Sequence, residues 1–215
     1  MWNLDSWESK KRNVRTPEER LAVSKTAGSL KLVGNRYEIG IPWTDERPEL
    51  PDNRKAAGNR LLSLERTLSK KPTLATRYRE VMQANIKKGY FETVDSTEET
   101  GPGWYLPHFP VVREDKATTK VRIVYDSAAR TEGVSLNDVM LPGPKLQLDV
   151  VDVLLRFRRR RIAIVGDIKE MFSQIVMAKE DRPYHRILWR DLDTSRPVTV
   201  YQAAHLTFGD CASLY

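Results

Sequence analysis

The chain has 215 residues, of which 40% are hydrophobic and 30% charged, a composition typical of a soluble globular protein of one or one and a half domains. Because it has no apolar run long enough to cross a bilayer, we expect no membrane partner and no signal peptide. The net charge of +7 suits a polyanionic partner without requiring one. The single cysteine, Cys211, excludes a disulfide framework and a cysteine-based zinc site, and it favours a reducing intracellular compartment.

The first third of the chain alternates helical and extended patterns. Residues 18–27 could form a helix, and the alternation over residues 32–41 around Gly34-Asn35 predicts a β-hairpin. Three prolines then impose an extended connector. Leucines at helical spacing predict a helix over residues 55–71, and a second apolar stripe predicts another over residues 73–88. Such stripes indicate core packing and carry no chemistry.

The middle of the chain is β-rich. Val111-Val112 and Val121–Tyr125 are predicted strands, joined by the charged loop 113–120. Such a loop can meet a triphosphate electrostatically, but it is also compatible with an ordinary solvated turn. A helix is predicted over residues 147–158. The arginine cluster at its end, Arg156 and residues 158–161, is interpreted as a solvated helix end in preference to a nucleic-acid patch.

A carboxylate follows the most apolar short run of the chain. Residues 162–165 predict a buried strand that ends at Asp167, and apolar side chains at helical spacing then predict a helix over residues 168–178. Asp167 could hold a divalent cation or simply cap that helix. Further strands are predicted at residues 184–189 and 198–201. The three histidines lack partners at metal-ligand spacing and are interpreted as structural.

The residues Asp-Ile-x-x-Met-Phe-x-Gln-Ile, at positions 167–175, resemble the first catalytic motif of reverse transcriptases, most closely that of the Bel/Pao family of LTR retrotransposons. Further segments agree with that family in the right order, and the match as a whole extends over nearly the whole chain. These segments are Arg36–Ile39, Pro48–Asn53, Trp104–Lys116, Thr119–Ala129, Val134–Asp138 and Arg186–Trp189.

This resemblance implies an α+β fold, an incomplete right-hand polymerase with fingers and the first part of the palm, preceded by an N-terminal hairpin and helical region. Residues 1–54 would be an N-terminal extension and connector, residues 55–160 a fingers-like region, and residues 161–215 a partial palm. Strand 162–166 would lie centrally in the palm sheet, with Asp167 at its exposed end. The Tyr-x-Asp-Asp hairpin of the family would follow the last of these segments, and the 215 residues contain no such sequence.

The resemblance also implies a site for metal and nucleotide. Asp167 would be catalytic and would bind metal together with Ile168. Arg122 would be the fingers arginine, whose planar guanidinium can stack on a base and bind phosphate. Either Lys116 or Lys120 would contact the γ-phosphate. The remaining nucleotide-binding residues would be Asp126, Phe172, Phe208 and Gly209.

Two of these assignments have alternatives. Phe172 would be a steric gate against the 2′-hydroxyl, but its spacing with Ile168, Met171 and Ile175 is equally that of a core aromatic. Phe208 and Gly209 fit the second palm motif, although Leu214 stands where the family has proline. The register after Gly209 therefore departs from the family pattern.

The implied activity is RNA-directed DNA polymerisation by a nucleotidyltransferase fragment of a retrotransposon polyprotein. Its partners would be an RNA or DNA template-primer and deoxynucleoside triphosphates, in cytoplasmic element particles or the nucleus, with the oligomeric state left open. The complete enzyme would use two Mg²⁺ ions held by carboxylates from more than one strand. Because two of the three expected carboxylates are missing, we expect the chain alone to be inactive. The alternative is a catalytically dead, domesticated remnant that binds nucleic acid or protein.

Overall fold

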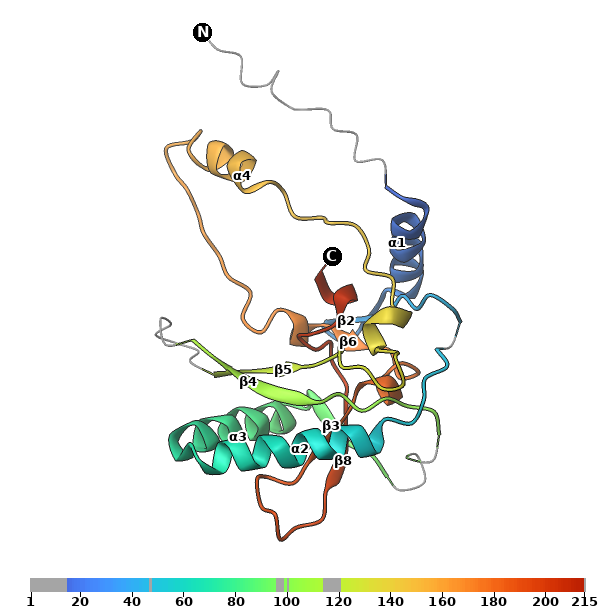
Figure 1. Cartoon of the computed structure of the whole chain (residues 1–215). Coiled ribbons are helices and arrows are strands. Elements are labelled where there is room, and N and C mark those ends of the chain that lie inside the picture. Colours follow the sequence, from blue (N-terminus) through green and yellow to red (C-terminus); the bar gives the residue numbers. More distant parts are fainter. Residues whose placement is uncertain (1–14, 47, 96–98, 100, 114–120, 215) are drawn as a thin grey trace.

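The computed structural model describes residues 15–46, 48–95, 99, 101–113 and 121–214. Over these residues the fold is mixed α+β, with four α-helices and three small sheets (Figure 1). Within the same residues, no helix combines the length and the apolar character needed to cross a membrane. The α+β class expected from the sequence is confirmed.

The first helix, α1 (Pro17–Ser29), begins at a capping box. The Thr16 hydroxyl accepts a hydrogen bond from the Glu19 amide at 3.1 Å, and the Glu19 carboxylate accepts one from the Thr16 amide at 2.7 Å. These two bonds satisfy amide groups that the first helical turn leaves without partners. Helix formation over the predicted residues 18–27 is therefore confirmed.

The predicted N-terminal hairpin forms from β1 (Lys31–Val33) and β2 (Arg36–Ile39), and its turn contains Gly34 at a φ of 63°. The far edge of β2 pairs in parallel with β6 (Val176–Met177). Because this pairing joins residues remote in sequence, the hairpin helps to hold the segment that follows Asp167.

Two long helices pack together under the central strands (Figure 1). They are α2 (Arg54–Ser69) and α3 (Pro72–Lys87), within two residues of the predicted bounds. The first residue of α3 is a proline, which has no amide hydrogen. The amide at this position would have no partner within the helix, so the proline costs no hydrogen bond. After α3, Gly89 adopts a φ of 75°, a conformation that favours glycine. Both predicted helices are confirmed.

Five strands form the other two sheets. The antiparallel hairpin pairs β4 (His108–Val112) with β5 (Val121–Tyr125), as predicted. The third sheet has the order β3-β8-β7, with strands β3 (Phe91–Thr93), β7 (Arg186–Trp189) and β8 (Thr199–Ala203). Residues 184 and 185, expected in a strand, instead belong to the 3-10 helix η4 (Arg182–His185). Two further 3-10 helices are η2 (Leu136–Val139) and η5 (Cys211–Leu214).

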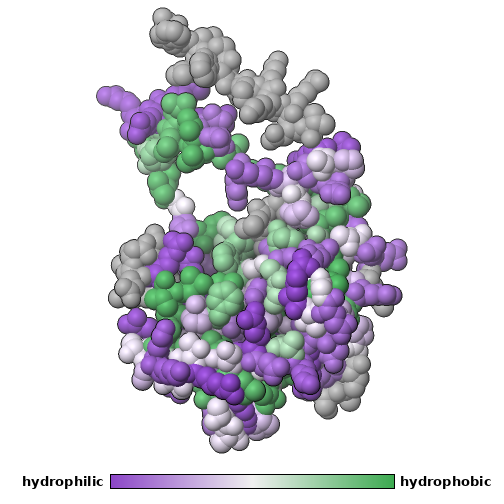
Figure 2. Space-filling view, viewed as in Figure 1, coloured by the Kyte–Doolittle hydropathy of each residue, from purple (hydrophilic) through white to green (hydrophobic). Residues whose placement is uncertain are grey.

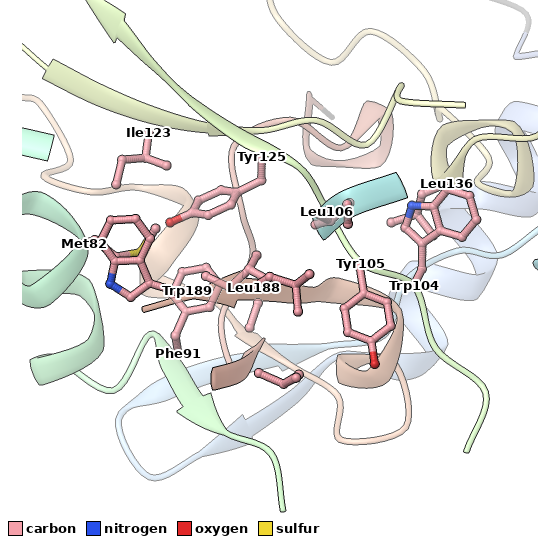
Figure 3. Packing of buried hydrophobic residues seen from close by; sticks show 14 of the residues in the cluster. Met82, Phe91, Trp104, Tyr105, Leu106, Ile123, Tyr125, Leu136, Leu188 and Trp189 are labelled. Carbon is pink, nitrogen blue, oxygen red and sulfur yellow. The ribbon is translucent and has the colours of Figure 1, made fainter. Parts of the chain in front are cut away.

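The core is built from side chains of the two long helices and of the sheets, and Figure 3 shows part of it. Its largest fully buried side chains include Trp104, Trp189 and Tyr78. His108 is buried with them: its Nε2 donates to the Leu188 carbonyl at 3.0 Å, and its Nδ1 accepts from the Tyr78 hydroxyl at 2.5 Å. Burial lowers the pKa of His108 to about 4, so the ring is neutral at pH 7. The interpretation of His108 as a structural residue agrees with this position.

The predicted buried strand over residues 162–166 is absent, and its apolar side chains face solvent. Ile162, Ile164 and Val165 are 81%, 89% and 81% exposed. A strand is stable only when neighbouring strands satisfy its backbone groups, and no strand of the described residues pairs with this run. The expectation of a central strand was wrong for this chain because the hydrophobic pattern does not supply a partner.

The helix predicted over residues 168–178 is also absent. The chain turns at Glu170, which has a φ of 55°, and then forms the short 3-10 helix η3 (Phe172–Gln174) before entering β6. The Glu170 carboxylate accepts hydrogen bonds from Lys88 and from the Tyr90 hydroxyl, the latter at 2.7 Å. These contacts, together with pairing to β2, override the helical spacing of the apolar side chains.

The helix expected over residues 147–158 is shorter, α4 (Val150–Phe157), and it is capped by the Asp149 carboxylate, which accepts from the Val151 amide at 2.8 Å. Its apolar side chains are exposed, and they form a green surface beside the purple arginines at the upper left of Figure 2. The helix stands away from the core (Figure 1). The apolar face of this helix therefore does not pack on the core.

Candidate functional site

Three segments that lie far apart in sequence meet at the end of β5. The first is Tyr125 with the residues that follow it, the second is the loop 207–211, and the third is η3. The Tyr125 amide donates to the Phe208 carbonyl at 3.2 Å. The rings of Phe208 and Phe172 meet edge to face, with their centroids 5.5 Å apart.

Gly209 makes this meeting possible. Its φ is 147°, and a Cβ atom at this position would lie 1.8 Å from the Tyr125 carbonyl oxygen. Any side chain would therefore force the loop away from β5. The glycine expected from the second palm motif thus has a steric reason to be present.

Arg122 and Asp126 lie on one side of β5. The buried side chains of the strand are Val121, Ile123 and Tyr125, so the alternate positions face the other way. Arg122 is exposed there, and Asp126 follows the strand with its side chain half-buried. The Asp126 backbone is fixed at both ends, because its amide donates to the Pro107 carbonyl at 2.7 Å and its carbonyl accepts from the Ala129 amide at 3.2 Å.

Asp167 lies in the exposed run before η3 and not at the end of a strand. Ile168, its neighbour, is 64% exposed. The anchor closest in sequence is Glu170, whose pKa is lowered by hydrogen bonds from Lys88 and Tyr90. Asp167 does not cap a helix, because the next helix along the chain, η3, begins only at Phe172. Lys116 and Lys120 lie outside the described residues.

The described residues do not by themselves fit a two-metal site. Among them, no group of three or more His, Cys, Asp or Glu side chains lies close enough to hold a metal ion. Two dications need several carboxylates within a few ångströms. Asp167 could supply one such carboxylate, and no group of three or more such side chains forms around it among the described residues.

A buried polar network was not found from the sequence. The Asp210 carboxylate, wholly buried, accepts hydrogen bonds from the Ser127 hydroxyl, from the Thr207 hydroxyl at 3.2 Å and from His185 Nε2 at 3.2 Å. The available signal was Asp210 itself, a charged residue in a run of small and apolar ones. Its partners His185 and Ser127 lie far from it in sequence, so no local sequence pattern links the three residues.

The network holds a buried charge pair. His185 Nδ1 donates to the Asp181 carbonyl at 3.3 Å while Nε2 donates to Asp210, so both ring nitrogens carry protons. Burial alone would lower the pKa of His185, but the charge of Asp210 and the hydrogen bonds to Asp210 and to the Asp181 carbonyl together raise it. Burial would likewise raise the pKa of Asp210, but the His185 charge and the hydrogen bonds lower it.

This arrangement differs from a hydrolytic triad. In a triad the serine donates to the histidine, which makes the serine a nucleophile. Here Ser127 donates to Asp210, and Ser127, His185 and Asp210 are all buried away from a substrate. The network can therefore fix neighbouring loops, but it cannot activate a hydroxyl.

Three surface depressions lie elsewhere. They measure about 520, 540 and 310 Å³, and none of the three is lined by a residue predicted for metal or nucleotide. Predicted site residues contact one another at the end of β5, where the Phe172 and Phe208 rings meet. No known protein-family model matches this chain, and no curated protein matches it either.

Proposed function

We propose that this chain forms the fingers and the first part of the palm of an RNA-directed DNA polymerase resembling those of Bel/Pao retrotransposons. The observation that carries the proposal is the contact of three motif segments at the end of β5. Tyr125, Phe208 and Phe172 each come from a different segment, and backbone or ring contacts join them. Segments of one active site are expected to converge in this way.

The proposed pocket accepts a deoxynucleoside triphosphate. Arg122 extends from the exposed side of β5, where its guanidinium can contact a base or a phosphate. Phe172 and Phe208 supply aromatic surface for the sugar, and Phe208 is 46% exposed. In this proposal Phe172 acts as the steric gate that leaves no room for a 2′-hydroxyl.

In this proposal Asp167 supplies only one of the carboxylates that a two-metal site needs. Mg²⁺ would neutralise charge on the triphosphate, and Asp167 would be one carboxylate ligand of the metal. The remaining carboxylates must lie within a few ångströms, so the strands that carry them must be neighbours, about 4.8 Å apart. A Tyr-x-Asp-Asp hairpin beside residues 162–166 would meet this need and would cover the exposed apolar run.

A second function is favoured by one observation. The apolar side chains of α4 and of residues 162–165 are exposed together, and exposed patches of this kind mark binding surfaces for protein. A catalytically dead remnant that binds a protein partner would present such a surface. This alternative does not account for the convergence of motif segments at the end of β5.

Equilibrium binding of a fluorescent RNA–DNA template-primer tests the first proposal. The purified chain should bind weakly, and the affinity should fall steeply with added salt because phosphate contacts release counterions. Arg122→Ala should reduce affinity about tenfold at low salt, as expected for the loss of one charge-assisted contact. Arg196→Ala is the matched control, since Arg196 is an exposed arginine paired with Asp193 in the loop between β7 and β8.

Equal affinities of the Arg122→Ala variant, the Arg196→Ala variant and the unmodified chain would contradict the assignment of Arg122. Absence of template-primer binding at any salt concentration would contradict the proposed function itself.

A further inference from the structure

We infer that Asp210 is a positioning residue of the candidate nucleotide site: it holds loop 207–211 against the end of β5, so that Phe208 packs on Phe172. The role of Asp210 in a nucleotide site rests on the proposed function. The position of loop 207–211 against β5, however, can be measured in the chain without ligand. The sequence resemblance assigns no role to Asp210.

Asp210 connects the loop to the residue beside Asp126. The Ser127 hydroxyl donates to one Asp210 oxygen, while Thr207 and His185 donate to the other. Ser127 follows Asp126 directly. One carboxylate therefore joins the loop of Phe208 to the turn that carries Asp126 and to η4 through His185.

Backbone contacts before and after Asp210 also join loop 207–211 to the end of β5 and to the turn after it. Before it, Phe208 accepts from the Tyr125 amide, and Gly209 lies against the Tyr125 carbonyl. After it, the Cys211 amide donates to the Asn137 side chain at 2.9 Å. The Asn137 amide in turn donates to the Ser127 carbonyl at 3.0 Å. The loop is thus closed around Ser127.

Burial makes this carboxylate effective. Asp210 and His185 have no exposed side-chain surface, so water does not compete for their hydrogen bonds. If one partner is removed, the other is left as a buried charge without compensation. The loop would then move to rehydrate the remaining group, and the edge-to-face contact of Phe208 with Phe172 would be lost.

The test is the nuclear Overhauser effect (NOE) between the Phe172 and Phe208 rings in the ligand-free chain. The chain has five phenylalanines and eight tyrosines, so selective labelling of these two residue types gives a simple spectrum. The rings of Phe91 and Tyr125, 5.1 Å apart in the core, provide an internal reference. We expect Asp210→Ala to abolish the Phe172–Phe208 NOE while the Phe91–Tyr125 NOE is retained.

Two further variants separate positioning from general loosening. Ser127→Ala removes a single hydrogen bond and keeps the pair of Asp210 with His185; it should weaken the same NOE. Glu65→Ala removes another buried carboxylate, which pairs with Arg190 at 2.6 Å, and it should leave the NOE unchanged.

Retention of the Phe172–Phe208 NOE in Asp210→Ala would overturn the inference. Its loss in Glu65→Ala as well, or the joint loss of the core reference, would also overturn it, because general loosening would then explain the result. If Asp210→Ala does not fold, Ser127→Ala decides by the same criterion. Template-primer binding is measured separately. If the chain does not bind template-primer, the NOE results still show whether Asp210 positions the loop.

Discussion

At the scale of single residues, Gly209 is the position where a change has the clearest steric result. A Cβ atom there would overlap the Tyr125 carbonyl oxygen. We expect Gly209→Ala to lower the free energy of unfolding by roughly 4 kcal/mol or more, the range reserved for severe core or backbone conflicts. Urea unfolding followed by circular dichroism measures this change.

Gly34→Ala is the matched control for that substitution. Gly34 also has a positive φ, 63°, but nothing lies within 4 Å of its added Cβ. Only the conformational cost of about 1 kcal/mol should appear. Similar losses in the two variants would show that loop 207–211 moves freely from β5, which contradicts the site geometry.

His108 gives the chain a pH dependence of known sign. Its pKa is about 4 in the folded chain, because burial disfavours the charged ring, against 6.5 when unfolded. As pH falls from 6.5 to 4, the unfolded state binds a proton that the folded state does not, so the free energy of unfolding falls, by roughly 3 kcal/mol in total.

Replacing His108 by Gln should remove most of this fall between pH 6.5 and pH 4. His205, whose pKa burial also lowers, contributes a remainder of the same sign. Urea unfolding at a series of pH values in both chains measures the difference. An unchanged slope in His108→Gln would show that His108 does not remain neutral in the folded chain.

Several predicted nucleotide-site residues meet in the structure, but the predicted catalytic residue does not join them. Phe172 and Phe208 meet edge to face, and Gly209 leaves room for the close approach of their loop to β5. These contacts depend on short local motifs. Asp167 remains exposed because its placement depends on strands beside it. Asp210 could not be predicted, since its partners Ser127 and His185 are remote in sequence.

At the scale of elements, most predicted helices and strands form, but strand 162–166 and helix 168–178, on either side of Asp167, do not. Both α2 and α3 form where apolar stripes and a bounding proline place them, because a helix satisfies its own backbone groups. Residues 162–166 carry an equally clear apolar pattern. A strand, however, needs a neighbour, and the local sequence does not reveal whether one exists.

The exposed α4 helix should contribute little to the stability of the chain. Leu154 is 49% exposed, whereas Leu68 in α2 is 1% exposed. We expect Leu154→Ala to change the free energy of unfolding by less than about 0.5 kcal/mol, and Leu68→Ala to lower it by about 3 kcal/mol. Urea unfolding of both variants checks this.

A large loss of stability in Leu154→Ala would mean that α4 packs on the core in solution. The apolar surface of α4 would then not be available to a further strand or a partner.

At the scale of the whole molecule, distant parts of the chain depend on one another. The pairing of β2 with β6 and the bond of Arg36 Nη1 to the Ser173 carbonyl, 3.1 Å long, connect the N-terminal hairpin to η3. Hydrogen bonds from Ile41 and Trp43 to the Asp181 carboxylate, both 2.7 Å, add a second connection. The N-terminal segment thus supports the candidate site.

Nucleotide incorporation should be undetectable with the 215-residue chain. Two of the three carboxylates expected for two-metal catalysis are absent from the sequence, and a single carboxylate cannot offset the charge of two dications. Primer extension with Mg²⁺ and labelled deoxynucleotides measures this. Robust primer extension would show that the 215 residues already contain a complete catalytic site, which contradicts the proposal.

The central claim is that the end of β5, loop 207–211 and η3 form one nucleotide pocket. Titration of the chain with a deoxynucleoside triphosphate, followed by NMR chemical shifts, tests it most directly. We predict that shifts concentrate at Tyr125, Asp126, Phe172, Phe208 and Gly209, while Glu65 and Arg190, which pair with each other, stay unchanged. Shifts confined to other surfaces, or none at saturating nucleotide, would contradict it.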